Sequence, residues 1–224
     1  MTVQQNGRVA RQPRAIATRK KIIDAGVDLF ADHGYGETSL GDITVRAGVT
    51  TGAFYHHFDS KEALAWAIIE QGWPKAVEVL DAVLGAPNPG LERVIEMTFS
   101  LSALMKRDRS VWIANHLNQA FGQLSERGRR EFKDHAQEFI RRIAQAIEPG
   151  DLKSEITPED VGNQVWIVLH GCHLLSDALM DDVIERLARS WSTLLPALVP
   201  AESLPYFLTF ADRAAGRHGQ AVGF

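Results

Sequence analysis

The sequence predicts an all-α protein. Apolar residues recur at the i, i+3, i+7 spacing of helix faces in segment after segment, and no stretch alternates in the manner of a β-strand. Glycine and proline interrupt the helical pattern most sharply at residues 85–90 (GAPNPG) and 149–150 (PG). We therefore expect a short N-terminal helical domain, a long connecting helix and a larger C-terminal helical domain.

The composition is that of an ordinary soluble globular protein: of 224 residues, 45% are hydrophobic and 23% are charged. No run of about 18 apolar residues offers a membrane span, and the N-terminus lacks the apolar core of a signal peptide. The single cysteine, Cys172, excludes a disulfide within the chain and suits a reducing compartment. We expect a cytoplasmic protein with no membrane contact.

Charge is unevenly distributed, although the net charge is only −4. No acidic residue precedes Asp24, and residues 61–224 hold 17 basic and 22 acidic residues. The basic residues ahead of Asp24 are Arg8, Arg11, Arg14, Arg19, Lys20 and Lys21. Residues 1–14 are polar and aperiodic, so they are predicted to form a flexible basic arm. Such an arm is either a solvated tail or a segment that binds a polyanion.

The first helix is expected over residues 15–33. Ile22, Ala25 and Leu29 form its apolar face, and Gly34 provides a left-handed stop.

Two shorter helices follow, over residues 40–47 and 51–58. Ser39 precedes Asp42 by three residues, which is a capping-box signature, and Gly48 stands where a glycine ends a helix. Two short helices joined by a tight turn that contains glycine are typical of a helix-turn-helix. Residues 15–58 are therefore predicted to form a three-helix helix-turn-helix DNA-binding domain.

The third helix has one anchored face and one open face. Phe54 and Phe58 are four residues apart and should hold it on the first two helices. The stripes away from that face carry Thr51, Gly52, Tyr55 and His56. A glycine inside a helix costs about 1 kcal/mol relative to alanine, which makes sense where another backbone, such as DNA, comes close. The alternative for the tyrosine and the histidine is a packed, partly exposed surface pair.

A connecting helix is expected over residues 59–84, beginning at Asp59 with Glu62 as its cap partner. Lys61 opposes the helix dipole in the first turn, which is reasonable if a phosphate docks at this N-terminus. The alternative is an exposed lysine without a role. Pro74 suggests a kink in this helix.

Residues 85–224 are predicted to form the second helical domain. Its helices are expected over about 91–106, 112–121, 124–147, 157–180, 181–198 and 204–213. The helix from Thr157 is apolar over more than half of its circumference, so it must be buried on several sides.

Residues 11–71 resemble the TetR family of one-component transcriptional regulators. The resemblance rests on T-R-x-x-I-I-x-A-G-x-x-L-F, H-G-Y-x-x-T-S-L-x-D-I and R-A-G-V-T-x-G-A-F-Y-H-H-F-x-S-K-E-x-L. The pieces A-R-Q-P-R-A, G-A-F-Y-H-H-F and L-A-W-A-I-I-E-Q look most similar to the γ-butyrolactone (autoregulator) receptor branch. The C-terminal part of the chain carries no motif that we can match.

The resemblance implies a homodimer whose two long C-terminal helices, residues 157–180 and 181–198, pair into a four-helix bundle. It implies a repressor that leaves a palindromic double-stranded DNA operator when a small-molecule inducer binds the C-terminal ligand-binding and dimerisation domain. In this branch the inducer is a γ-butyrolactone-type signal. The alternative is a regulator of efflux or catabolic genes with a different hydrophobic inducer. No cofactor is implied.

Individual contacts are carried over by position. Thr38 and Ser39 would meet phosphate, and Lys61 would meet the DNA backbone. Arg11 and Arg14 would lie along the adjacent minor groove or backbone. The residues facing the major groove would be Thr51, Gly52, Ala53, Tyr55 and His56. The chain departs from the family at position 51, where lysine is frequent and this chain has threonine. One phosphate or guanine contact is therefore in doubt, and DNA affinity should depend more on the basic arm, residues 1–14.

Ligand cavities are largely apolar with a few convergent polar groups. Seven residues at helix-facing positions fit that description: Phe99, Met105, Trp112, His116, Trp166, His170 and His173. For each aromatic residue the alternative is plain core packing. Receptors of this branch typically place a tryptophan over the ligand, and the sequence does not choose between the two candidates.

A metal site and a catalytic site are both weakly supported. His170 and His173 share a helix face, but two ligands do not make a site. Cys172 lies in an apolar stretch, which fits a small core residue better than an activated nucleophile. No G-x-S-x-G, Walker or dinucleotide fingerprint is present. We expect no metal and no enzyme; a helical enzyme and a purely structural dimerisation protein are the competing classes.

Overall fold

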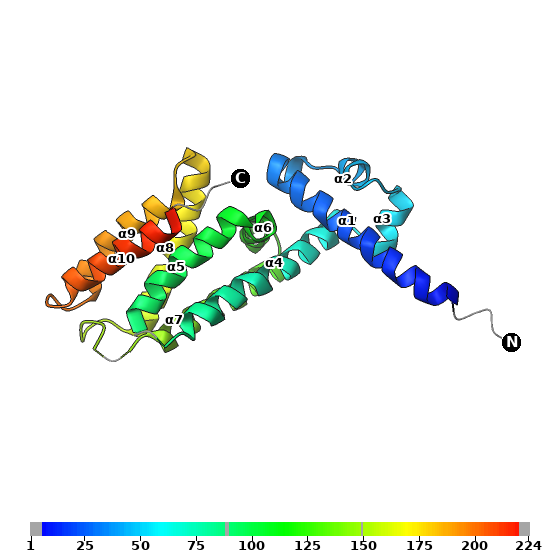
Figure 1. Ribbon diagram of the computed structural model, residues 1–224. Coiled ribbons are helices and arrows are strands. Elements are labelled where there is room, and N and C mark those ends of the chain that lie inside the picture. Colours follow the sequence, from blue (N-terminus) through cyan, green and yellow to red (C-terminus); the bar gives the residue numbers. More distant parts are fainter. Residues whose placement is uncertain (1–5, 88–89, 149, 220–224) are drawn as a thin grey trace. The chain divides into compact units, whose positions relative to one another are not determined.

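The computed structural model describes residues 6–87, 90–148 and 150–219, with side chains from residue 13 onward (Figure 1). All the regular elements in these residues are helices. They are α1 (Asn6–Glu37), α2 (Leu40–Ala47), α3 (Thr51–His57), α4 (Lys61–Leu84), α5 (Gly90–Arg107), α6 (Arg109–Leu124), α7 (Glu126–Ala146), α8 (Pro158–Leu179), α9 (Val183–Leu198) and α10 (Leu204–Gly219). The predicted all-α fold is confirmed.

The chain forms two compact units. The first unit is Met1–Trp73 with Arg109–Asn118, and the second unit is Pro74–Asp108 with Gln119–Phe224. The division therefore runs inside α4 and α6 rather than at the glycine- and proline-rich segment after residue 84.

Helix α1 is longer than the expected 15–33. It begins at Asn6 and includes Pro13, because the preceding alanine, arginine and glutamine residues favour helix and outweigh one lost backbone donor. The break at Gly34 has φ 83° and ψ 157°, so this glycine takes the mirror image of an extended conformation instead of the left-handed helical one. The predicted apolar face of α1 is buried, with Ile22, Ala25 and Leu29 at most 8% exposed.

The helix-turn-helix pair agrees with the sequence patterns. Ser39 and Asp42 form the capping box of α2, and Gly48 ends this helix with φ 64° and ψ 40°. Thr50 caps α3 through the backbone N–H of Ala53. These are contacts between residues three apart, which sequence spacing describes directly.

The start of α4 differs from expectation. Ser60 is its cap, since the Ala63 N–H donates to Ser60 Oγ at 3.0 Å. Glu62 instead accepts a hydrogen bond from Trp66 Nε1 at 3.2 Å. The helix begins at Lys61, two residues after Asp59, and continues through Pro74 to Leu84.

Gly72 explains why the first part of α6 joins the first unit. A Cβ atom at this glycine would lie 2.4 Å from the Cβ of Ala114 and 3.0 Å from the carbonyl oxygen of Ser110. Helices α4 and α6 can approach this closely only because residue 72 has no side chain.

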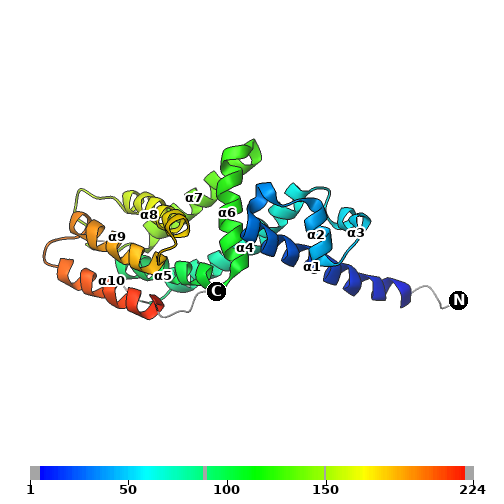
Figure 2. The same cartoon turned by 90° about the horizontal axis from the view of Figure 1, so that it is seen from above.

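The second unit packs α7 on α8, and α5 on α9 and α10. Helices α9 and α10 lie side by side in both views (Figures 1 and 2). Trp191 of α9 is 2% exposed, and its Nε1 donates to Thr98 Oγ1 of α5 at 2.9 Å. This core thus consists of large apolar helix faces, and a buried polar group within it, such as the Trp191 indole N–H, has a hydrogen-bond partner.

Helix α8 has one face that is buried against the rest of the chain and another face that is exposed to solvent. Val161, Val165, Leu169 and Cys172 are at most 5% exposed. Apolar residues on the open face are Ile167 (62% exposed), Leu174 (59%), Leu175 (47%) and Leu179 (62%). The expectation that this helix is buried on several sides is therefore not met within one chain. In the described part of the chain, no helix has the length and hydropathy needed to cross a bilayer.

Candidate nucleic-acid interface

Helix α3 packs against the protein through one buried face, and its opposite face is exposed to solvent. Phe54 is fully buried and Phe58 is 5% exposed, with their ring centroids 5.8 Å apart. On the other side Tyr55 is 53% exposed. Thr51, Gly52 and His56 are also exposed, and Ala53 is half-buried. The structure thus brings the five predicted groove-facing residues together on one short helix.

Gly52 is not required by the packing of the protein itself. A Cβ atom at this position would meet only Thr50 Oγ1, at 3.9 Å. The open space above a helical glycine leaves room for the close approach of another backbone.

The corner between α1 and α2 is built on Thr38 and Lys61. Thr38 is 2% exposed, and its hydroxyl lies 2.8 Å from the Gly34 carbonyl oxygen and 3.2 Å from that of Leu29. Lys61 Nζ donates to the carbonyl oxygens of Tyr35 and Thr38 at 2.7 and 2.8 Å. The same ammonium lies 4.3 Å from the centroid of the Tyr35 ring. Both side chains, predicted to meet phosphate, therefore hold the protein's own backbone.

This geometry gives Thr38 a structural role. Its buried hydroxyl lies against main-chain carbonyls and fixes the turn ahead of α2, and a phosphate contact by Thr38 stays a prediction. The two bonds to main-chain carbonyls use two of the three ammonium protons of Lys61. The third proton could donate to a DNA phosphate, so a contact between Lys61 and the DNA backbone stays a prediction.

Ser39 is exposed at the start of α2. Its hydroxyl donates to Asp42 Oδ2 at 2.6 Å, and its Oγ accepts from the Asp42 N–H at 3.1 Å. The bonds from the Ser39 hydroxyl and N–H lower the pKa of Asp42. A phosphate contact by Ser39 would therefore compete with the capping box.

The basic residues of α1 continue toward α3. Arg14 is exposed, whereas the side chain of Arg11 lies outside the described residues. The guanidinium carbon of Arg19 lies 5.1 Å from the centroid of the Phe58 ring. Arg19 is therefore a candidate DNA contact that is not among the predicted site residues. The sequence places it in the basic cluster ahead of Asp24, but only tertiary packing brings it close to α3.

Ion pairs connect α6 to the DNA-binding helices. Arg46 NH2 lies 2.8 Å from Asp28 Oδ2, and Arg109 NH1 lies 3.8 Å from Asp28 Oδ1. Arg109 also pairs with Asp32, and this hydrogen bond lowers the pKa of the Asp32 carboxyl. Helices α1, α2 and α6 thus share one cluster of charges.

The predicted ligand residues fall into separate groups. Trp112 and His116 belong to the first unit, with ring centroids 4.1 Å apart and His116 Nδ1 2.9 Å from the Trp112 carbonyl oxygen. In the second unit, the ring centroids of Trp166 and His170 lie 3.9 Å apart with the rings tilted by 45°, and the Trp166 ring contacts that of Phe132 edge to face at 5.6 Å. The α7–α8 aromatic cluster (Phe132, Phe139, Trp166 and His170) contains only two of the seven predicted residues.

A buried polar pair lies on α5 and α8 of the second unit. His173 is 4% exposed, and its Nε2 lies 3.0 Å from the hydroxyl oxygen of the fully buried Ser102. Phe99 and Met105 of α5 are at most 6% exposed. Sequence reasoning missed Ser102, although a small polar residue on an apolar helix face was the available signal.

Cys172, His170 and His173 have different hydrogen-bond partners. Cys172 Sγ lies 3.4 Å from Ser190 Oγ, and burial raises the pKa of its thiol. His170 Nδ1 lies 3.0 Å from the Trp166 carbonyl oxygen, and His173 bonds to Ser102. A raised thiol pKa also disfavours a nucleophilic role for the cysteine.

Known proteins share both the DNA-binding region and the whole fold. Residues 22–68 match the family model for bacterial regulatory proteins of the tetR family. The A-factor receptor protein of Streptomyces griseus is 46% identical over 63 residues, which cover 28% of this chain and 23% of that protein.

Two solved structures match nearly the full length. A γ-butyrolactone receptor (ArpA-like protein) has a TM-score of 0.75 and 27% identity, covering 91% of this chain and 99% of that one. CprB from Streptomyces coelicolor, in complex with its operator sequence, has a TM-score of 0.72 and 27% identity, covering 90% and 98%. Residues 22–68 therefore form a TetR-family N-terminal domain, and γ-butyrolactone receptors are close structural neighbours of the whole chain.

Proposed function

We propose that this protein is a ligand-responsive transcriptional repressor that binds a palindromic operator as a homodimer in the cytoplasm. The observation that carries this proposal is the outer face of α3, where Thr51, Gly52, Tyr55 and His56 are exposed above two buried phenylalanines. The major groove of B-DNA is about 12 Å wide and admits one helix presented in this way. The similarity to CprB, which was solved with its operator, supports the same reading.

The DNA contacts divide into two kinds. Tyr55 and His56, with Thr51, Gly52 and Ala53 beside them, reach base edges. Arg11, Arg14, Ser39 and the remaining proton of Lys61 meet the backbone. Backbone contacts position the protein without reading sequence, so only the α3 group sets operator preference.

The open apolar face of α8 is the proposed dimer contact. Ile167, Leu174, Leu175 and Leu179 recur at helical spacing and are between 47% and 62% exposed. A continuous apolar stripe of this kind is unfavourable in water and marks an interaction site. Pairing α8 and α9 with those of a second copy would complete the burial that one chain leaves undone.

Residues 85–224 are the proposed ligand-binding and dimerisation region. The neighbouring rings of Trp166 and His170, with Phe132 beside them, offer aromatic groups and an imidazole to a small, largely apolar inducer. The similarity to γ-butyrolactone receptors favours a lactone-type signal. The inducer lowers operator affinity only to the extent that it binds the DNA-incompetent state more tightly. No catalysis is part of this proposal.

The test is a titration of the purified protein with DNA from immediately upstream of its own gene, at two salt concentrations, with and without a γ-butyrolactone. Tyr55→Ala should lose about 1–3 kcal/mol of specific binding if Tyr55 reads a base. Tyr206→Ala is the matched control, since Tyr206 of the second unit is 55% exposed against 53% for Tyr55.

Each result has a defined meaning. Specific binding that the lactone abolishes supports the whole proposal. Specific binding that ignores the lactone keeps the repressor and points to a different hydrophobic inducer. If Tyr55→Ala and Tyr206→Ala bind like the wild type, the proposed α3 interface is overturned.

A further inference from the structure

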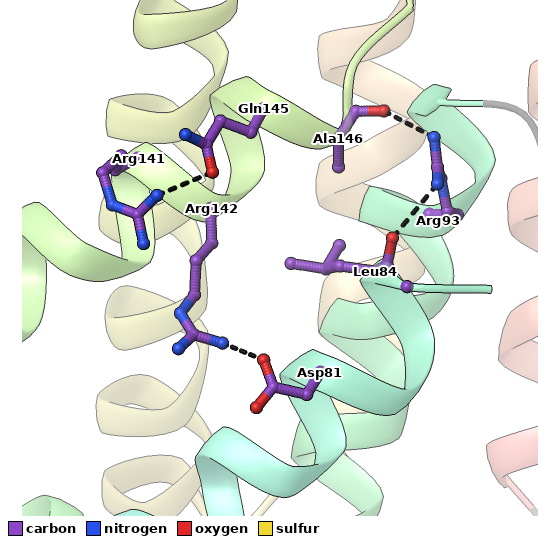
Figure 3. Close-up of a pocket in the computed structure, with 8 residues that line it drawn as sticks. Asp81, Leu84, Arg93, Arg141, Arg142, Gln145 and Ala146 are labelled. Carbon is purple, nitrogen blue, oxygen red and sulfur yellow. Dashed lines mark hydrogen bonds and ion pairs between the residues drawn. The ribbon is translucent and has the colours of Figure 1, made fainter.

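The second unit contains a cavity that none of the predicted ligand residues lines. It has a volume of about 370 Å³ and is bounded by the end of α4, the start of α5 and the last turns of α7. Its walls include Asp81, Leu84, Arg93, Arg141, Arg142 and Gln145. Figure 3 shows Arg142 reaching from α7 toward Asp81 of α4, and Arg141 lying beside Gln145 on α7.

We propose that this cavity is a second ligand site, and that it binds a small oxyanion: the carboxylate or phosphate group of an organic acid. Three guanidinium groups and one carboxylate line it. Guanidinium groups bind carboxylate and phosphate in a bidentate manner, which lysine cannot reproduce. The volume falls within the range of about 300–1,000 Å³ that is typical of small-molecule sites.

Arg93 provides the fixed end of the site. Its NH1 donates to the carbonyl oxygens of Leu84 and Ala86, both at 3.1 Å, and its NH2 donates to that of Ala146 at 3.0 Å and to Glu148 Oε1 at 3.2 Å. Because these partners use its terminal N–H groups, Arg93 contributes positive charge to the site, and Arg141 and Arg142 donate to the anion. The side chain is only 16% exposed. This guanidinium therefore keeps its position, between the ends of α4 and α7, whether or not a ligand is present.

Arg141 and Arg142 provide the end of the site where a ligand can replace a carboxylate partner. Both bind Glu138, whose Oε1 accepts from Arg141 NH2 at 2.7 Å and from Arg142 Nε at 2.6 Å. Arg142 also pairs with Asp81. These two guanidinium groups lower the pKa of the shared Glu138 carboxyl to about 2. Arg141 uses three of its five guanidinium N–H bonds on Glu138 and Gln145, and Arg142 uses two on Glu138 and Asp81, so both retain N–H bonds that can donate to another anion.

The carboxylates that now hold these arginines are more open to water than Arg142 and Arg93 are. The side chains of Asp81 and Glu148 are 63% and 57% exposed, against 24% for Arg142 and 16% for Arg93. Because exposed ion pairs contribute little, an incoming anion can replace Asp81 and leave it solvated. Binding is thus an exchange of partners, and we expect a midpoint on the order of millimolar.

Gln145 adds a neutral donor. Its Oε1 accepts from Arg141 NH1 at 2.7 Å, which leaves the amide nitrogen to donate to a ligand. Arg141 and Gln145 also line a second cavity of about 570 Å³, where Ile140, Ala144 and Pro158 lie beside the polar residues Gln137, Glu159 and Asn163. The two cavities together suit an acid whose charged group lies among the arginines and whose remaining part, with both carbon and polar groups, lies on this mixed wall.

The test is isothermal titration calorimetry of the full chain with inorganic phosphate, citrate and acetate, each at constant ionic strength. Phosphate and citrate separate the two possible chemistries, and acetate reports a single carboxylate. The test variant is R141Q/R142Q. The control is R129Q/R130Q, which removes the same charge from exposed residues of the same helix that do not line either cavity.

The expected result is saturable binding of phosphate or citrate to the wild type and the control, weakened at least about tenfold in R141Q/R142Q. Hydrogen exchange should slow at residues 81–86 and 141–146 in the liganded wild type. Three outcomes would overturn the proposal: no saturable binding of any of the three anions, equal binding to R141Q/R142Q, or equal loss in the control. If R141Q/R142Q does not fold, the single variant Arg141→Gln, which keeps the Arg142–Asp81 pair, replaces it.

Discussion

The ammonium nitrogen of Lys61 lies 2.8 Å from the carbonyl oxygen of Thr38, although 23 residues separate the two in the chain. The same nitrogen reaches the Tyr35 carbonyl oxygen at 2.7 Å. The first residue of α4 thus closes the corner from which α2 starts, and α2 in turn supports α3. Lys61 therefore has a structural role in this corner, whether or not it also contacts DNA.

Replacing Lys61 with methionine should lower the free energy of unfolding by about 1–3 kcal/mol, because two charge-assisted hydrogen bonds are lost. Urea unfolding of the purified variant measures this change. Lys133→Met, at an exposed position of α7, is the control and should be near neutral. If Lys61 also contacts DNA, the slope of log affinity against log salt should fall by about one. Unchanged stability would contradict the structural role.

Alanine at Gly34 should destabilise the protein more than alanine at Gly48. Gly48 has φ 64° and ψ 40°, a left-handed conformation that costs a non-glycine residue about 1–2 kcal/mol. Gly34, at φ 83° and ψ 157°, lies near a region that is essentially closed to other residues. Neither added Cβ would meet a neighbour within 4 Å, so backbone strain alone sets the difference. Thermal unfolding of both variants tests the order, and the reverse order would refute it.

Arginine at Leu174 should convert the dimer to a monomer. Leu174 is 59% exposed on the open face of α8, and a buried charge without a partner opposes association. Sedimentation velocity at several protein concentrations gives the mass. Leu124→Arg changes another exposed leucine, at 70%, and should leave the dimer intact. A dimer that survives Leu174→Arg would place the interface elsewhere.

Glu138→Gln should remove a stabilisation that depends on pH. Hydrogen bonds from Arg141 and then Arg142 lower the pKa of this carboxyl from its ordinary 4.5 to about 2. A depressed folded-state pKa means that the stabilisation is fully present above pH 4.5 and is lost as the pH falls toward 2. The melting temperatures of wild type and variant should therefore differ most above pH 5 and converge progressively as the pH falls from 4.5 toward 2. A difference that stays constant over this range would show that another interaction is responsible.

The caps of α2 and α3 and the faces of α3 followed from sequence because they are local. Ser39 with Asp42, Gly48, and Phe54 with Phe58 all interact over one helical turn, or depend on one residue's own backbone preference. The start of α8 also agrees with the sequence, which predicts a helix from Thr157, and Thr157 is its N-cap. Two helix starts differ from their predicted positions: α1 begins at Asn6, and α4 begins at Lys61 with Ser60 as its cap in place of the predicted Asp59.

The sequence by itself determined the all-α class, the helix-turn-helix and the exposed residues of its reader helix, since local spacing specifies helices and their faces. Only the tertiary structure decided that Thr38 and Lys61 hold a corner, that α4 meets α6 at Gly72, and that Trp166 of α8 packs against Phe132 of α7. It also placed Arg93, Arg141 and Arg142 around one cavity. Most of these arrangements join residues tens of positions apart, and the energy of such contacts depends on how helices pack rather than on spacing within one helix.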